Sequence, residues 1–164
     1  MIELLVGPIC SGKSTYAILR ASQGAIIIND DSIVTALHGD YELYSKGLKP
    51  IYKTLENTIL QMAITMGRDV VVDRPNMSRD NRKRFIGISL AMDEQVVAVM
   101  FPNHGPEKHA RMRFECNPRG KSLEHWIKAA QRHQGIYQKP ELSEGLADIV
   151  PVADVVRSFE SKGV

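Results

Sequence analysis

Cysteine is scarce in this sequence, which contains only Cys10 and Cys116 among its 164 residues. Two thiols cannot provide the disulfide framework that would hold a chain of this size together, so we expect a reducing compartment, the cytoplasm. No apolar run approaches the roughly 18–20 residues that span a bilayer, which argues against an integral membrane protein. The N-terminus, Met-Ile-Glu-Leu-Leu-Val-Gly, also lacks the basic segment and the small-residue cleavage site of a secretory signal.

The sequence also has no large excess of positive or negative charge. It contains 21 Lys and Arg and 19 Asp and Glu, which gives a net charge of +2. A chain so close to neutrality cannot coat nucleic acid as a polycation, so any such contact must come from local basic clusters. The five histidines and two cysteines show none of the spacings of a zinc site. No repeat, low-complexity tract or Pro/Gly/Ser-rich linker divides the chain, so residues 1–164 are expected to form one domain.

Short apolar segments alternate with helical patterns along the chain. Strands are predicted at residues 2–6, 25–28, 69–73, 95–101 and 148–152, and Pro151 indicates an edge position or an early end for the last of them. Helices are predicted at residues 13–21, 32–37, 50–66, 78–92, 107–113 and 122–137. Ser32 is the expected cap of the second helix. The inward stripe of the fourth is expected to be Phe85, Ile86, Ser89 and Leu90. This order predicts an α/β fold, a parallel sheet sandwiched between helices.

Residues 7–14, Gly-Pro-Ile-Cys-Ser-Gly-Lys-Ser, match the phosphate-binding pattern G-x-x-x-x-G-K-[ST] without a gap. The motif follows a predicted strand and opens a predicted helix, which is the context that it requires. Its glycines let backbone N–H groups face bound phosphates. Lys13, expected on an exposed loop, would reach the β- and γ-phosphates, and the Ser14 hydroxyl would ligate Mg²⁺. The predicted nucleotide-binding residues are Gly7, Cys10, Ser11, Gly12, Lys13, Ser14 and Thr15.

Acidic residues follow two of the predicted strands. Asp73 comes directly after three valines, where a strand next to the loop strand would carry an acid that holds Mg²⁺. Asp30 and Asp31 follow the second strand, and the carboxyl ends of parallel strands face the ligand crevice. One of this pair is a candidate general base toward an acceptor hydroxyl, while the other can cap the next helix.

Basic residues form two groups. Those on the helix after Asp73 are typical of a solvated helix face; they are Arg79, Arg82, Lys83 and Arg84. The second group surrounds a segment between two helices and comprises Lys108, Arg111, Arg113, Arg119 and Lys121. Phosphoryl-transfer enzymes commonly bring an arginine onto the transferring phosphate, so residues 106–122 are the expected lid.

Taken together, these segments resemble the kinase domain of bacteriophage polynucleotide 5′-hydroxyl kinase/3′-phosphatase and related small P-loop kinases. The resemblance runs through residues 7–15, 28–31, 40–46, 70–76, 81–82, 119–120 and 140–150, nearly the whole chain. It implies a P-loop NTPase fold with a small helical lid, and a stand-alone kinase because no phosphatase segment follows. A phage-encoded kinase would work in the cytoplasm of its host.

The same resemblance implies roles for individual residues. Lys13 would grip the ATP phosphates, Asp30 would be the general base, and Arg119 would clamp the donor phosphates from the lid. Asp73 would lie at the floor of the acceptor and metal site, and Asp31 would turn toward the next helix and act structurally. Two departures lie on the acceptor side. The polynucleotide kinases carry an arginine three residues after the base, where this chain has Ile33, and a small hydroxyl residue in place of Arg74. Arg74 could supply the missing charge from the opposite wall.

The leading hypothesis is an ATP- and Mg²⁺-dependent kinase that phosphorylates a hydroxyl on nucleic acid, first of all the 5′-OH end of DNA or RNA. A kinase of a hydroxymethylated base in DNA, and a kinase of a nucleoside, sugar or other metabolite, remain as alternatives. A different class, an ATP-binding switch or assembly ATPase, is less favoured because the chain has little room for sensor and oligomerisation elements.

Overall fold

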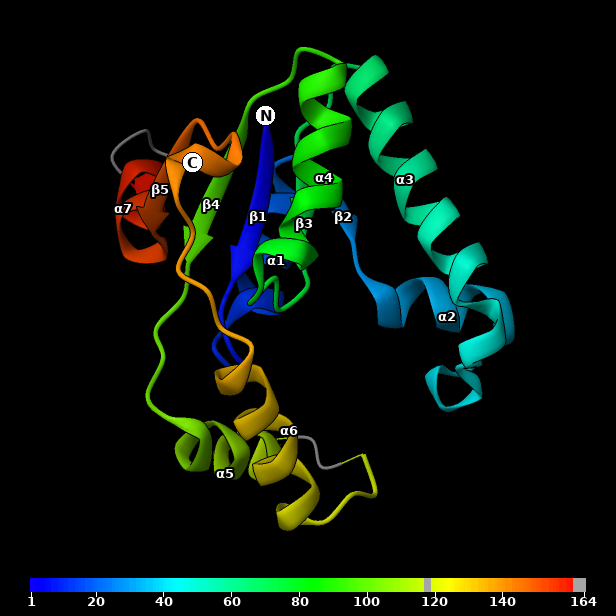
Figure 1. The fold of residues 1–164 in the computed structure, drawn as a ribbon, viewed down its shortest axis with the longest axis vertical. Coiled ribbons are helices and arrows are strands. Elements are labelled where there is room, and N and C mark those ends of the chain that lie inside the picture. Colours follow the sequence, from blue (N-terminus) through cyan, green and yellow to red (C-terminus); the bar gives the residue numbers. More distant parts are fainter. Residues whose placement is uncertain (117–118, 161–164) are drawn as a thin grey trace.

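A parallel five-stranded sheet forms the centre of the computed structural model, which describes residues 1–116 and 119–160. The strands are β1 (Ile2–Val6), β2 (Ile26–Ile28), β3 (Val70–Val72), β4 (Val96–Met100) and β5 (Asp148–Pro151). Their order is β2-β3-β1-β4-β5, and each neighbouring pair is parallel. Strands β1 and β3 are buried along their whole length, as expected of central strands covered on both faces. In Figure 1 they run side by side in the middle of the molecule.

Helices cover both faces of the sheet. Their bounds are α1 (Lys13–Ser22), α2 (Asp30–His38), α3 (Lys49–Thr65), α4 (Arg79–Ala91), α5 (Pro106–Cys116), α6 (Leu123–Gly135) and α7 (Val152–Glu160). Short 3-10 helices lie at η1 (Tyr41–Leu43), η2 (Lys46–Leu48) and η3 (Leu142–Glu144). One apolar core joins α3 and α4 to the sheet, and a second joins α1 and α7 to its other face. The predicted sandwich of helices around a parallel sheet is therefore confirmed.

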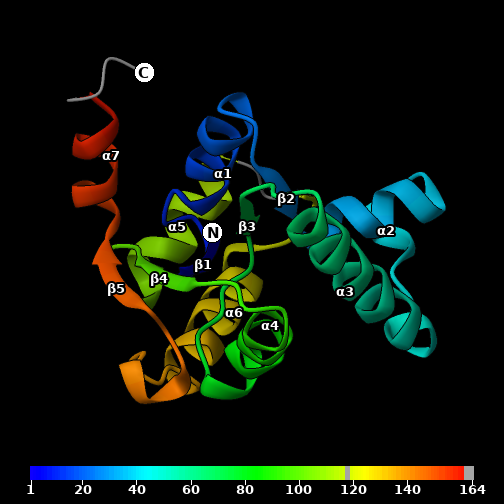
Figure 2. The ribbon, with the colours of Figure 1, turned by 90° about the horizontal axis from the view of Figure 1, so that it is seen from above.

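Two helical parts project beyond the carboxyl ends of the strands. The α5–α6 pair lies past the arrowheads of β1 and β4 in Figure 1. It overlaps the predicted lid, residues 106–122, and continues to Gly135; the pair is called the lid below. Seen from above in Figure 2, α2 and α3 extend outward beyond β2, while α7 lies at the opposite side next to β5. The carboxyl end of the sheet is thus bordered by the lid on one side and by α2 on another. Within the described ranges, every helix is too short or too polar to cross a membrane.

Several local predictions need correction. Asn29, not Ser32, caps α2, because its side-chain oxygen accepts a hydrogen bond from the Ser32 N–H at 3.0 Å. Leu90 is 53% exposed instead of part of the inward stripe of α4, since the close packing there ends at Ser89. Helix α7 was not predicted, and its valines pack against the second core. Pro151 ends β5, which is an edge strand as predicted.

The basic face of α4 is solvated only in part, because Arg79 and Lys83 are exposed as predicted but Arg82 and Arg84 are not. Arg82 is fully buried, and its guanidinium binds both carboxylate oxygens of Glu144 at 2.8 and 2.6 Å. Arg82 also donates to the Asn76 carbonyl at 3.0 Å. A buried arginine needs such partners because an unpaired charge in the interior is costly. Its acidic partner lies 62 residues further along the chain, so sequence proximity could not reveal it.

Candidate active site

The loop between β1 and α1 has the tight geometry that a phosphate-binding loop needs. Cys10 and Gly12 adopt left-handed backbone conformations, with φ of 53° and 95°. A Cβ atom at Gly7 would lie 2.7 Å from the Cβ of Phe101, so only glycine fits between the loop and the end of β4. Gly12 is the N-cap of α1 and makes no side-chain cap, so the first N–H groups of α1 remain available to an anion.

Lys13 is buried, contrary to the expectation of an exposed loop position. Lys13 is the first residue of α1, and its side chain folds back toward the loop. Its Nζ donates to the Pro8 carbonyl at 2.5 Å and lies 3.4 Å from the Ser11 hydroxyl. Among residues 1–116 and 119–160, no carboxylate forms an ion pair with it. Burial lowers the pKa of Lys13 to about 8, and the charge of Asp73 opposes this shift. A buried ammonium group held only by neutral oxygens fits an anionic ligand.

Asp73 and Ser14 line the same opening. Asp73 directly follows β3, next to the loop strand as predicted, and it is 7% exposed. The Asn29 amide donates to the Asp73 carbonyl at 3.0 Å and to its carboxylate at 3.2 Å, which fixes the orientation of the acid. Ser14, in the first turn of α1, is exposed to the opening. A hydroxyl and a carboxylate are hard oxygen donors of the kind that Mg²⁺ prefers.

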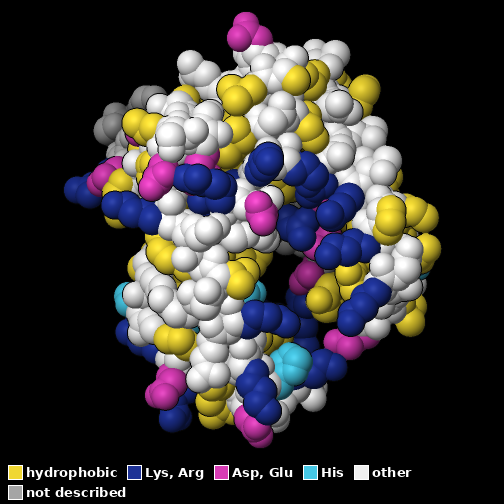
Figure 3. Space-filling view, in the orientation of Figure 1, with side chains coloured by type: hydrophobic (Ala, Val, Ile, Leu, Met, Phe, Trp, Pro, Cys, Tyr) yellow, Lys and Arg dark blue, Asp and Glu magenta, His cyan; other side chains and the backbone are white. Residues whose placement is uncertain are grey.

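A cleft of about 630 Å³ joins these groups to the lid. The predicted site residues that line it are Cys10, Lys13, Ser14, Asp30, Asp73, Arg74 and Arg119. Gly7, Ser11, Gly12 and Thr15 do not line it, although all four belong to the loop or the first turn beside it. Figure 3 shows Lys and Arg side chains gathered around the hollow between the body of the molecule and the α5–α6 pair.

Asp30 pairs with Arg74, and both side chains line the cleft. The Nη2 atom of Arg74 lies 2.8 Å from Oδ2 of Asp30, at the start of α2. Burial raises the pKa of Asp30, and the positive charge of Arg74 counteracts the rise. Ile33, which stands where the resembling kinases carry an arginine, is buried in a core with Val34 and Tyr52. In this chain the cation beside the acid therefore comes from the end of β3, not from α2.

Asp31 lies in the first turn of α2, which is capped by Asn29 and not by Asp31. It forms an ion pair with Arg119 of the lid at 2.9 Å. The Arg119 guanidinium also lies 4.7 Å from the centre of the Tyr41 ring. Lys121 makes a second, longer contact to Glu42 at 3.4 Å. Arg119 and Lys121 thus contact the α2–η1 side of the cleft, and Arg119 pairs with Asp31 instead of contacting the loop.

The cleft is also lined by Arg113, which belongs to the second basic group, and by residues of α6 that the sequence did not single out: His125, Trp126, Ala129, Arg132 and His133. The Arg113 guanidinium lies 4.9 Å from the Trp126 ring, and burial together with the charge of Arg119 lowers its pKa. Trp126, Ala129 and His133 all line the cleft from α6. They follow a spacing of three and four residues, a helical stripe that could have identified this face.

His133 has an unusual environment in the cleft. In the described part of the chain its buried Nδ1 atom has no hydrogen-bond partner. Burial lowers the pKa of His133 to about 4, and the nearby charges of Lys13 and Arg132 add to the effect. The folded protein therefore holds this histidine neutral at pH 7.

This predicts a stability change at acidic pH. The unfolded chain takes up a proton on His133 near its ordinary pKa of 6.5, whereas the folded chain does so only near 4. Stability from this group is complete above pH 6.5 and is lost as the pH falls toward 4. We expect His133→Gln to flatten the decline in melting temperature over this interval. His125→Gln, on an exposed position of the same helix, is the matched control. Parallel curves for wild type and His133→Gln would contradict the prediction.

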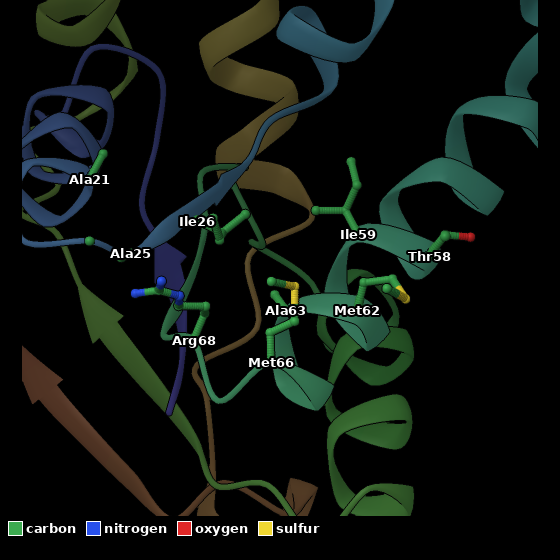
Figure 4. A pocket seen from close by; sticks show the side chains of 10 residues that line it. Ala21, Ala25, Ile26, Thr58, Ile59, Met62, Ala63, Met66 and Arg68 are labelled. Carbon is green, nitrogen blue, oxygen red and sulfur yellow. The ribbon is translucent and has the colours of Figure 1, made fainter.

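A second cavity, of about 670 Å³, lies away from these groups. Figure 4 shows it between Ile26 of β2 and the side chains of Ile59 and Met62 from α3 and of Met66 just after this helix, with Arg68 at one end. It contains none of the predicted site residues. Its apolar lining offers no set of groups for phosphoryl transfer, so the cleft beside Lys13 is the candidate active site.

The strand order, the loop between β1 and α1 and the acid after β3 define a P-loop NTPase fold. Residues 2–114 match the model of the AAA domain family, and the chain belongs to this family. No curated protein matches the sequence.

Solved structures similar to this chain share its fold. A protein from Chloroflexus aurantiacus, provisionally described as a kinase, superimposes with a TM-score of 0.68 at 9% identity, covering 99% of this chain and 97% of its own. Kti12 from Chaetomium thermophilum, in complex with ADP-AlF3, gives 0.57 at 13% identity and coverages of 92% and 88%. A gluconokinase from Sinorhizobium meliloti gives 0.54 at 16% identity and coverages of 94% and 86%. At such identities the likeness shows the fold alone.

Proposed function

We propose that this protein is an ATP- and Mg²⁺-dependent kinase that transfers the γ-phosphate to a hydroxyl group. The observation that carries the proposal is the convergence of Lys13, Asp73 and Asp30 on one cleft at the carboxyl end of the sheet. Each comes from a different segment, and each has the charge that its proposed role requires. Ligands of open α/β sheets bind at this end.

On the donor side, the chain offers a buried cation, a helix N-terminus and two oxygen ligands. Lys13 would exchange its contact with the Pro8 carbonyl for phosphate oxygens, which satisfies an ammonium group that now lacks an anionic partner. Ser14 and Asp73 would hold Mg²⁺, which when bound offsets the negative charge of the phosphates. The likeness to a structure that binds ADP-AlF3 supports the nucleotide assignment.

On the acceptor side, Asp30 would act as the general base. Its Oδ2 atom is paired with Arg74, and this is the one ion pair that Asp30 makes within the described residues. Oδ1 is therefore the oxygen available to accept the proton of the attacking hydroxyl. Burial raises the pKa of Asp30, which makes the carboxylate a stronger base than an exposed aspartate.

We propose nucleic acid as the acceptor, with the 5′-OH end as the first candidate. The cleft wall beyond Asp30 is formed by Tyr41 and Tyr44, and the cations Arg74, Arg119 and Lys121 border it. Aromatic rings and cations around an open groove suit the bases and phosphates of a single strand. The sequence resemblance to polynucleotide kinases supports the same acceptor.

A small metabolite is the second candidate acceptor, and a hydroxymethylated base in DNA is a variant of the first. The fold likeness to a gluconokinase favours a small molecule. A cleft of about 630 Å³ is also of the size that encloses small ligands.

Labelled ATP incubated with a panel of acceptors tests the proposal. The panel contains 5′-OH oligonucleotides of DNA and RNA, DNA with hydroxymethylated bases, nucleosides and sugars. Label on the 5′ end supports the first candidate, and label on a base, nucleoside or sugar replaces it with that acceptor. Release of phosphate without transfer to any acceptor would contradict a kinase and favour an ATP-binding switch.

Replacing Asp30 with asparagine is expected to lower transfer about 10²- to 10⁴-fold, the usual contribution of a general base. The affinity for ATP·Mg²⁺ should hardly change, because Asp30 acts on the acceptor hydroxyl. Calorimetry and initial rates measure the two quantities. Asp31→Asn is the comparison, since it breaks the contact with Arg119 but leaves the Asp30–Arg74 pair. If Asp31→Asn is the inactive variant and Asp30→Asn the active one, the base is Asp31.

A further inference from the structure

A chain of alternating charges leads from the cleft into the interface between α3 and α4. Arg74 binds Asp30 through Nη2 at 2.8 Å and Glu56 of α3 through Nη1 at 2.6 Å. The other carboxylate oxygen of Glu56 pairs with Arg84 of α4. From the cleft inward, acidic and basic side chains therefore alternate in the order Asp30, Arg74, Glu56 and Arg84.

The inner part of this network is rigidly held. Glu56 is fully buried, and both of its carboxylate oxygens are engaged by arginines. Arg84 is anchored in turn by the Asn57 side chain at 2.8 Å and the Lys53 carbonyl at 3.1 Å. Its guanidinium also lies over the Phe85 ring at 4.3 Å. A buried carboxylate is tolerated only with such partners, so Glu56 is fixed relative to the α3–α4 pair.

Arg74 divides its guanidinium nitrogens between Asp30 and Glu56, and this affects how Asp30 is held in the cleft. An arginine with no other partner can bind both oxygens of a carboxylate through two parallel hydrogen bonds. Here Glu56 holds Nη1 and so fixes the orientation of the guanidinium, in which Nη2 is the nitrogen that contacts Asp30. Asp30 is thus held at a single oxygen, and the other stays accessible from the cleft. Without Glu56, Arg74 would be free to bind Asp30 through both nitrogens and to cover the oxygen that accepts the proton.

We propose that Glu56 is a positioning residue for phosphoryl transfer, which acts through Arg74 to keep one oxygen of Asp30 free for the acceptor hydroxyl. This inference rests on the proposed function, because it assigns Glu56 a role toward the proposed general base. Nothing in the motifs of the sequence marks Glu56, which sits among the apolar positions of a helix.

Charge adds a second effect in the same direction. The groups that face Asp30 are Arg74 and Arg84, which lower its pKa, and Glu56 and Asp31, which raise it. The Tyr41 hydroxyl from η1 is also within electrostatic reach of Asp30. Removing the charge of Glu56 lowers the pKa of Asp30 and weakens it as a base, so the acidic limb of the pH–rate profile shifts to lower pH.

The Glu56→Gln variant tests the proposal because it keeps the shape of the side chain and removes its charge. We expect kcat for transfer to fall about 10- to 100-fold, comparable to the loss when an outer-shell partner of a metal ligand is removed. The KM for ATP should stay unchanged, and the acidic limb should move to lower pH. In the double variant Glu56→Gln/Arg74→Gln, transfer should be no slower than in Arg74→Gln alone.

Glu144→Gln is the matched control, since it removes another buried carboxylate paired with an arginine, remote from the cleft. Both variants are assayed at a temperature where they remain folded. An equal loss of kcat in Glu144→Gln, or an unchanged kcat and pH profile in Glu56→Gln, overturns the proposal. If Glu56→Gln does not fold, Arg74→Gln is used instead, because it leaves Glu56 paired with Arg84. A wild-type kcat in Arg74→Gln would also overturn the proposal.

The same experiment separates this inference from the proposed function. If Asp30→Asn is inactive and Glu56→Gln is fully active, only the role of Glu56 is refuted. Asp30→Asn fully active would refute the general base itself, and with it both proposals.

Discussion

Replacing Lys13 with methionine is expected to abolish phosphoryl transfer without destabilising the fold. Methionine keeps most of the buried volume of the lysine stem but has no charge for the donor phosphates. Alanine would instead leave a cavity, because Lys13 is only 7% exposed. Burial of the ammonium group lowers its pKa from 10.5 to about 8, so holding it charged at pH 7 costs on the order of 3 kcal/mol. We therefore expect a melting temperature equal to or above that of the wild type.

Two measurements check this prediction: transfer of label from ATP, and thermal unfolding followed by circular dichroism. Lys83→Met is the control, since Lys83 is an exposed lysine of α4 and does not line the cleft. Phosphoryl transfer near the wild-type rate in Lys13→Met would contradict the assignment of the loop as a phosphate-binding loop. A large loss of stability would show that Lys13 is held by stronger contacts than its bond to the Pro8 carbonyl.

Replacing Arg119 with alanine is expected to lower transfer about 10³- to 10⁵-fold, the effect of an arginine on a transferring phosphate. In this structure the guanidinium is paired with Asp31 and lies over Tyr41, so it must leave Asp31 to reach the donor phosphates. Arg119→Lys should not restore the rate fully, because an ammonium group lacks the planar fork of the guanidinium. Single-turnover rates with saturating ATP measure the effect.

Arg113 is the competing candidate for this role. It lines the same cleft and stacks near Trp126, whereas Arg111 of the same helix does not line the cleft and serves as the control. If Arg113→Ala is crippling and Arg119→Ala is mild, Arg113 is the arginine that contacts the transferring phosphate. Comparable rates in Arg111→Ala and wild type would show that α5 tolerates the loss of an arginine.

Local sequence was enough to predict the features that depend on few neighbouring residues. The loop at residues 7–14 could be predicted because its glycines, lysine and serine must occupy adjacent positions to surround a phosphate. Apolar runs predicted the strands, since both faces of a central parallel strand are covered. The position of Asp73 followed from the same reasoning, because the carboxyl ends of parallel strands meet at one edge of the sheet.

Other features depend on partners that are distant in the chain, and only the tertiary structure decided them. Lys13 is buried because its side chain folds back onto the Pro8 carbonyl, which the motif alone does not imply. Arg82 is buried because folding brings Glu144 to it across 62 residues.

On the acceptor side of the site, it is clearest which features the sequence predicts and which depend on the tertiary structure. The sequence by itself determined that acids would follow β2, since Asp30 and Asp31 come one residue after an apolar run. The structure decided which cation each acid meets: Arg74, two residues after β3, for Asp30, and Arg119 of the lid for Asp31. It also placed Glu56 behind Arg74. A motif specifies residues that lie together in the chain, whereas ion pairs form between side chains that only packing of the helices on the sheet brings within reach.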